Sequence, residues 1–90
     1  MKVLDEGHKY EMAAGQGITF VKKVGGELVY DGVQNDEVLE VLIDRMKYLQ
    51  AAVPCRENAL VITKLEEALM WLEKRTKDRV KRSVEGTGNK

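Results

Sequence analysis

The sequence predicts an α+β fold, with a small antiparallel β-meander or hairpin followed by a two-helix antiparallel hairpin whose C-terminal helix is long. Short β-rich runs alternate with glycines in the first third of the chain. From Val38 onward, apolar residues recur at helical spacing, and Pro54 divides this region in two. Ninety residues suffice for one core, so we predict a single domain with a β-rich part at 1–33 and a helical hairpin at 35–86.

The strands are predicted from three β-rich runs. Gly25-Gly26 separates the last two runs, and a glycine pair is a hairpin signal because both turn positions adopt positive φ without steric cost. Gly15-Gln16-Gly17 favours a second turn. The result is a three-stranded meander formed by residues 8–13, 18–24 and 27–31.

The first helix is predicted to start at Asn35, a good N-cap residue. Asp36 and Glu37 follow, where negative charge favours the helix dipole. The helix should end near residues 51–53, because proline disfavours helical geometry in the residue before it.

The second helix is predicted to carry Pro54 in its first turn and to run to Gly86, about 28 residues or roughly 42 Å. A 3-4 repeat marks its packing seam: Ile62, Leu65, Leu69, Leu72 and Thr76. Three large apolar residues lie off that seam: Leu60, Met70 and Trp71. We interpret them as sheet contacts or as an oligomer interface.

The composition favours binding over catalysis. One cysteine, Cys55, and one histidine, His8, are too few for a disulfide, a metal site or a catalytic set. No phosphate-binding loop, dinucleotide fingerprint or nucleophile elbow occurs. We therefore expect no enzyme activity and no cofactor. No apolar run is long enough to span a membrane and no secretory signal is evident, so the expected location is the cytoplasm.

The charges are asymmetric although the net charge is zero. Six of the nine basic residues from position 56 onward lie between Lys74 and Arg82, and the spacing i, i+4, i+7 places Arg75, Arg79 and Arg82 on one helical face. Converging guanidiniums suit phosphate oxygens. A basic helix end that is solvated or paired with Glu73 and Asp78 is the alternative.

Three further positions have two interpretations each. Asn58 either bonds backbone in the first helical turn or contacts a ligand. Tyr48, across the Pro54 turn, either forms the edge of the core or stacks on a nucleobase. The pair Lys22-Lys23 either faces water or neutralises a phosphate.

The segment from Val38 to Thr87 resembles the helical-hairpin domain shared by phage anti-Thoeris and anti-CBASS cyclic-nucleotide sponges. The resemblance is carried mainly by RENAL at 56–60 and TKLEEALMW at 63–71, and it covers a little over half of the chain. The β-rich first third is closer to the anti-Thoeris branch.

The resemblance implies a phage immune-evasion protein that sequesters a second messenger in the infected host without degrading it. The ligand would be a glycocyclic ADP-ribose isomer, and some members also bind cyclic di- or trinucleotides at a separate site. By motif position, Asn58, Arg75 and Arg79 would line the pyrophosphate and ribose site, and Tyr48 would stack on adenine. Lys22 or Lys23 would contact the second site, and Lys23 is the one that we include among the site residues.

Small size, a long second helix and off-seam apolar residues predict a homo-oligomer, either a dimer or a hexamer built as a trimer of dimers. The predicted pockets lie between antiparallel copies. The alternative is a nucleic-acid-binding accessory protein that uses the basic helix end, which zero net charge disfavours. A third possibility is a scaffold whose arginines form ion pairs between subunits.

Overall fold

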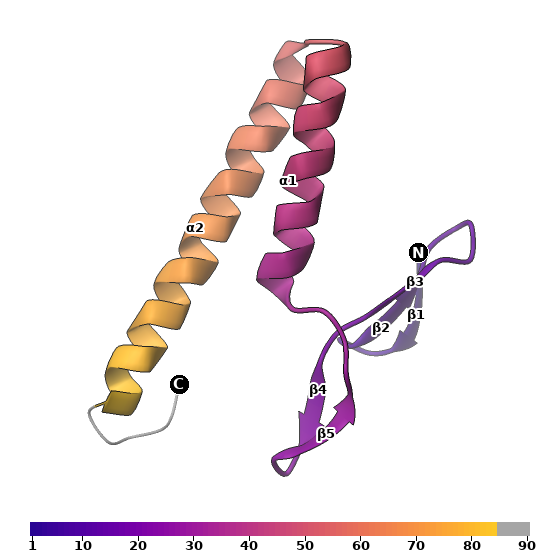
Figure 1. Cartoon of the computed structure of the whole chain (residues 1–90). Coiled ribbons are helices and arrows are strands. Elements are labelled where there is room, and N and C mark those ends of the chain that lie inside the picture. The colour runs from indigo at the N-terminus through magenta and orange to yellow at the C-terminus, as the bar shows by residue number, and fades with distance from the viewer. Residues whose placement is uncertain (85–90) are drawn as a thin grey trace. The chain divides into compact units, whose positions relative to one another are not determined.

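The structure, a computed structural model, describes residues 1–84 of the chain. It divides into two compact units, Met1–Glu37 and Val38–Lys90. The first unit contains all the strands and the second is a helical hairpin, so the predicted α+β class is confirmed (Figure 1). The polar tail at 85–90, which includes the predicted helix end at Gly86, lies outside the described residues.

The first unit contains two small antiparallel sheets, not one meander. The first sheet has the order β1-β2-β3, and the second pairs β4 with β5. The prediction therefore missed one strand, and it was wrong about the run at 18–24, which is divided between β3 and β4. The bounds are Lys2–Asp5 for β1, Lys9–Glu11 for β2, Gly17–Thr19 for β3, Lys22–Val24 for β4 and Glu27–Tyr30 for β5.

The break between β3 and β4 has a backbone cause. Val33 donates its N–H to the Thr19 carbonyl at 2.9 Å and accepts the N–H of Val21 at 3.1 Å, forming an isolated parallel bridge beside Phe20. The chain can approach this closely only because residue 32 is glycine, since an added Cβ at Gly32 would collide with the backbone of Thr19. Because Thr19 and Val21 both bond to Val33, the run at 18–24 cannot continue as one straight strand in a single sheet.

The predicted hairpin at Gly25-Gly26 is confirmed. It joins β4 to β5, and the two glycines adopt φ of 60° and 84°. Both values lie in the left-handed region, which side chains with a Cβ avoid. The turn chemistry visible in the sequence therefore fixes this hairpin.

A polar cluster links the two sheets. Lys22 on β4 donates to the Asp5 carboxylate on β1 at 3.0 Å, and the Tyr30 hydroxyl on β5 also interacts with this carboxylate and helps to lower its pKa. The Lys9 ammonium lies 4.1 Å from the centre of the Tyr30 ring, a cation–π contact. The pairing register shifts between Val3 and Asp5 on β1 and between Lys22 and Lys23 on β4. Such irregularities change the direction in which the neighbouring side chains point.

Helix α1 spans Asn35–Ala52, close to the predicted bounds. Its first turn is capped differently from the prediction. Asn35 is the first helical residue, and the Glu37 carboxylate accepts the backbone N–H of Gln34 at 2.9 Å. This is the reciprocal half of a capping box, in which the third helical residue bonds back to the cap.

Helix α2 spans Arg56–Val84, and Pro54 lies in the connecting turn instead of the first helical turn. Cys55 precedes the helix, and its sulfur accepts the backbone N–H of Asn58 at 3.4 Å. The Gln50 side-chain amide holds the turn through two bonds to the Cys55 backbone, at 3.0 and 3.1 Å. Proline thus ends α1, while Gln50 and Cys55 determine how α2 begins.

The helices lie side by side near the turn and diverge toward the other end (Figure 1). Ile43, at 8% exposure, is the only buried apolar side chain in the described part of the chain. The predicted seam is half-buried at Ile62, Leu65, Leu69 and Leu72, whereas Thr76 is exposed and bonds the Leu72 carbonyl at 3.1 Å. The hairpin therefore has a narrow apolar seam and little core beyond it.

The polar cluster predicts a specific pH dependence for the first unit. The bonds from Lys22 and Tyr30 lower the pKa of Asp5, so the stability this carboxylate contributes is present above the ordinary aspartate pKa and is lost as the pH falls. The bond to Asp5 raises the pKa of Lys22 and of Tyr30, so their contributions are lost as the pH rises. The unit should be most stable between about pH 5 and pH 9.

Asp5→Asn should therefore lower the amide protection factors of β4 and β5 at neutral pH, measured by NMR hydrogen exchange. The difference from the unchanged protein should shrink as the pH falls below the ordinary aspartate pKa, because the native carboxyl then becomes protonated as well. Asp31→Asn is the matched control, because Asp31 is exposed and forms no ion pair with residues 1–84. Equal protection in both variants at neutral pH would contradict the assignment.

Candidate functional site

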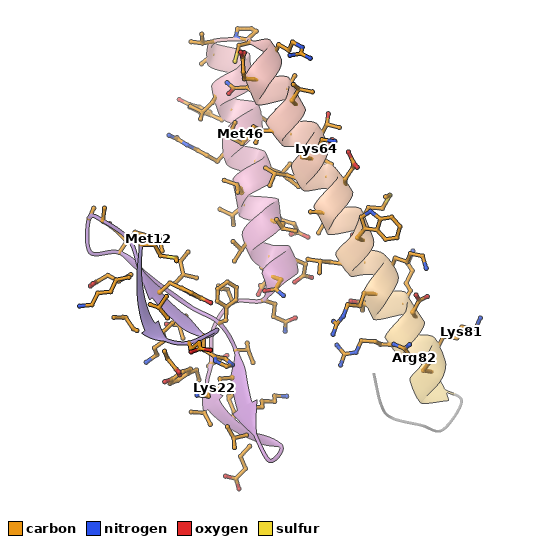
Figure 2. The ribbon with its side chains drawn as sticks, turned by 180° about the vertical axis from the view of Figure 1, so that it is seen from behind. Met12, Lys22, Met46, Lys64, Lys81 and Arg82 are labelled. Atoms are coloured by element: carbon orange, nitrogen blue, oxygen red, sulfur yellow. The ribbon has the colours of Figure 1, made fainter. Side chains whose placement is uncertain are left out.

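The basic cluster at the C-terminal end of α2 separates into two sides. Arginines occupy positions 75, 79 and 82, and lysines occupy positions 74, 77 and 81. At 100° per residue these two sets lie on different sides of the helix. Figure 2 shows the neighbours Lys81 and Arg82 projecting in opposite directions.

Two of the arginines have no acidic partner. Arg75 and Arg79 are exposed, and neither forms an ion pair within residues 1–84. The Asp78 carboxylate, a candidate partner in the sequence, instead pairs with Lys74 at 3.2 Å. The interpretation in which Arg75 and Arg79 pair within the chain therefore finds no support in these contacts.

Asn58 lies in the first turn of α2, on the seam side of the helix. It precedes Ile62 and Leu65 at i, i+4 and i+7, and like them it is half-buried. Its backbone N–H is used by the Cys55 sulfur. Its side-chain amide forms no hydrogen bond to any residue in the described range, so it is available to a ligand or to water.

Tyr48 lies near the end of α1 and is 69% exposed. Val41, two turns earlier, is 70% exposed and lies on the same side of the helix. The ring is therefore not part of the hairpin seam. Its exposure leaves it free to stack on a flat ligand.

One chain does not bring the predicted site residues together. Asn58 and Tyr48 flank the turn, but Arg75 is 17 residues beyond Asn58, which is roughly 26 Å along a helix. Arg79 is one turn farther. Lys23 is exposed on β4 in the first unit. Within one chain, Asn58 and Arg75 are therefore too far apart to contact the same small ligand.

An apolar surface adjoins the arginine side. Trp71, 60% exposed, lies one turn before Arg75, and Leu60 and Val61 are 43% and 41% exposed. A side chain as large as tryptophan buries 150–250 Å² when it is covered. We call this surface of Leu60, Val61, Trp71, Arg75 and Arg79 the arginine face.

One hollow among the described residues is acidic. It lies between α1 and α2, has a volume of about 390 Å³, and is lined by Glu40, Ile43, Asp44, Lys47, Glu66, Leu69 and Glu73. Lys47 is paired with Glu66 at 3.4 Å. Four carboxylates against one lysine repel an anion, so this acidic groove is a poor site for a nucleotide. Sequence analysis missed it, although Glu40 and Asp44 share a helical face.

Sequence analysis also missed the role of Lys22. The lysine was expected to face water or a phosphate, but its ammonium is bound to Asp5, 17 residues away. No local pattern signals this pair, because it depends on the two strand irregularities. Lys23 is the exposed lysine of the pair.

The described residues define the general class of the chain. Residues 1–84 contain no group of histidine, cysteine and carboxylate side chains that could hold a metal ion. None of their helices combines the length and the apolar character needed to cross a membrane. The helical hairpin exposes Arg75, Arg79 and Tyr48 and keeps Asn58 half-buried. Guanidinium groups suit anionic ligands, and an exposed aromatic ring suits a flat one.

Comparison with known families identifies this hairpin. The family model described as the Acb2/Tad1 hairpin domain matches residues 12–77. This match spans most of the chain, and the protein belongs to the Acb2/Tad1 hairpin-domain family. The resemblance noted in the sequence is thereby confirmed.

A relative within this family is "Thoeris anti-defense 1" from Bacillus phage SBSphiJ7. It is 54% identical over 61 residues, which are 67% of this chain and 43% of the relative. The chain therefore matches less than half of the relative's length. The match is consistent with the closeness to the anti-Thoeris branch that the β-rich first third indicated.

Arg75 and Arg79 form no ion pair within residues 1–84, so we predict that they do not stabilise the fold. Arg75→Ala and Arg79→Ala should each change the free energy of unfolding by less than about 0.5 kcal/mol in urea titrations without ligand. Leu69→Ala, on the half-buried seam, should cost about 2 kcal/mol. A comparable loss in the arginine variants would show that the guanidiniums are structural.

Proposed function

We propose that this protein is a phage anti-defence protein that binds a cyclic nucleotide messenger of bacterial immunity and withholds it from its effector. The ligand class is the glycocyclic ADP-ribose isomer of Thoeris, with cyclic di- or trinucleotides of CBASS at a second site. Family membership and the Thoeris anti-defense relative support the role. The observation that carries the proposal is the pair of exposed guanidiniums of Arg75 and Arg79, which have no acidic partner within residues 1–84.

The proposed contacts match the chemistry of such a ligand. A guanidinium presents two parallel N–H donors to phosphate oxygens, and this geometry gives short, charge-assisted bonds to a pyrophosphate. The Asn58 amide offers both a donor and an acceptor to ribose hydroxyls. Tyr48 offers an exposed ring for adenine.

The site is proposed to form between two copies. In an antiparallel pair, the Arg75 and Arg79 end of one α2 lies beside the start of α2 in the other copy. That helix start also carries the positive end of the helix dipole, which adds to anion binding. Two-fold symmetry then gives two equivalent pockets per dimer.

The proposed role is storage without chemistry. The four principal contacts are two arginines, an amide and a tyrosine, which hold a ligand but supply no general base of ordinary pKa near 7. His8 is in the first unit, where its Nδ1 lies 3.0 Å from the Glu6 carbonyl. The proposed site of action is the cytoplasm of the infected host.

The test of the function is a thermal-shift panel of cyclic ADP-ribose isomers, cyclic di- and trinucleotides, and duplex DNA. A cyclic nucleotide should raise the melting temperature, and intact ligand should be recovered after heat denaturation. Arg75→Ala or Arg79→Ala should weaken binding about ten- to a hundredfold, because each removes a charge-assisted bond. Lys74→Ala is the control on the same helix, since Lys74 lies on a different side from the arginines and is paired with Asp78.

Mixing the variants tests whether the site is shared. Asn58→Ala and Arg75→Ala chains, each of which should bind more weakly, should regain part of the lost affinity when they are mixed and refolded together. One pocket of each mixed dimer then carries both native residues. A recovered hydrolysis product would contradict sequestration. A shift with duplex DNA alone would favour a nucleic-acid-binding protein.

Tyr48 should act through its ring. A stacked base contributes about 1–3 kcal/mol and tolerates one aromatic residue for another. Tyr48→Phe should keep most of the affinity and Tyr48→Ala should lose most of it, measured by calorimetry at unchanged oligomeric mass. If Tyr48→Phe is as damaging as Tyr48→Ala, the hydroxyl is the group that binds. If neither affects binding, the proposed pocket is in the wrong place.

A further inference from the structure

The side of α2 that bears the lysines has its own regular pattern. Glu66, Met70, Glu73, Lys77 and Val80 follow one another at intervals of four, three, four and three residues, so they lie along one stripe of the helix. Met70 and Val80 are 55% and 59% exposed. The stripe, with Lys81 beside Val80, lies on a different side of α2 from the arginine face. We call it the lysine face.

Charge is segregated along the lysine face. Its N-terminal half carries Glu66 and Glu73, and its C-terminal half carries Lys77 and Lys81. Neither lysine has an acidic partner within the part of the chain that is described, whereas Lys74 on the neighbouring stripe is paired with Asp78. The face therefore presents one negative and one positive patch in line.

The acidic groove enlarges the negative patch. Glu66 and Glu73 line both the groove and the lysine face, and α1 adds Glu40 and Asp44. Lys47 pairs with Glu66 and leaves three of these carboxylates without an ion pair within residues 1–84. The groove is also lined by the apolar side chains of Ile43 and Leu69. A lysine suits such a groove, because its methylene stem covers apolar surface while its ammonium meets the carboxylates.

We propose that the lysine face is a contact between two copies of this chain, in which the α2 helices pack antiparallel about a two-fold axis level with residue 75. In this register Glu73 of each copy faces Lys77 of the other, and Met70 faces Val80. Lys81 of each copy lies opposite Leu69 of the other, above the acidic groove. Two-fold symmetry makes every contact twice.

A second copy complements both the negative and the positive patch of the lysine face, whereas a nucleic acid or a basic peptide complements only one of them. A nucleic acid would be attracted by Lys77 and Lys81 but repelled by the carboxylates in line with them. A basic peptide would fill the groove and leave the two lysines facing positive charge. An antiparallel copy offers lysines to the carboxylates and carboxylates to the lysines, because the order of charge along α2 is reversed in it.

This contact goes beyond the proposed ligand function. It uses the lysine face and leaves the arginine face, with Trp71, open. A chain with two distinct self-complementary faces can build assemblies larger than a dimer. Because the contact needs no ligand, it can be tested without one.

The experiment is a charge-reversal series, with mass measured by light scattering and sedimentation at low ionic strength without nucleotide. Glu73→Lys and Lys77→Glu each place like charges opposite each other twice. Each should halve the assembly mass, or raise its dissociation constant by about tenfold or more. The double variant Glu73→Lys/Lys77→Glu restores opposite charges, so it should return to within about threefold of the unchanged protein. Helix content by circular dichroism should be equal in all variants.

Glu67→Lys is the matched control, because it makes the same charge change on α2 away from the lysine face, where Glu67 pairs with Lys64 at 3.5 Å. It should leave the mass unchanged. A Cys55→Ser background removes the single cysteine and allows a second readout. Chains carrying Glu73→Cys mixed with chains carrying Lys77→Cys should form 73–77 disulfides in preference to 73–73.

The proposal is overturned if both reversals behave like Glu67→Lys, or if the double variant associates as weakly as the single ones. These outcomes are independent of the ligand. If no nucleotide binds but the double variant regains its assembly mass, the proposed function is rejected and the contact between lysine faces stands. If a nucleotide binds but the double variant does not regain its mass, the function stands and the contact is rejected.

Discussion

The narrow apolar seam between α1 and α2 is the constraint on which the rest of the structure depends. Only Ile43 is buried within the described residues, and each helix contributes one half-buried stripe to the seam. A seam of this width covers one side of each helix and leaves the remainder exposed. The hairpin consequently presents several different surfaces at once, and function must be sought there and not in an interior pocket.

The length difference between the helices adds to this effect. Helix α2 has 29 residues and α1 has 18, so α2 extends roughly 16 Å farther. The extended part carries the basic cluster, and its arginines and lysines lie on different sides of the helix. Arginine suits planar, bidentate recognition of phosphate, and lysine suits a mobile ion pair. The distribution of the two residue types therefore fits the two proposals, in which one face binds a ligand and the other contacts a second copy.

The first unit follows a different principle. Its strands are three or four residues long and bury no side chain, so apolar packing alone holds it weakly. Its two sheets are linked by the Val33 bridge and by the Asp5, Lys22 and Tyr30 cluster. Both links join residues more than ten positions apart. They depend on Gly32 and on strand irregularities, which re-aim side chains out of the regular ladder.

The sequence by itself determined the features that depend on neighbouring residues. Helical periodicity placed both helices and the seam at Ile62, Leu65, Leu69 and Leu72, Gly25-Gly26 placed the hairpin, and the motifs at 56–71 identified the family. Only the tertiary structure decided the split of the 18–24 strand, the use of Lys22 by Asp5 and the exposure of Tyr48. It also showed that Asn58 and Arg75 are separated in one chain and that an acidic groove lies between the helices. These features depend on contacts between distant residues, and a local pattern of propensity and spacing carries no information about which distant residue a side chain meets.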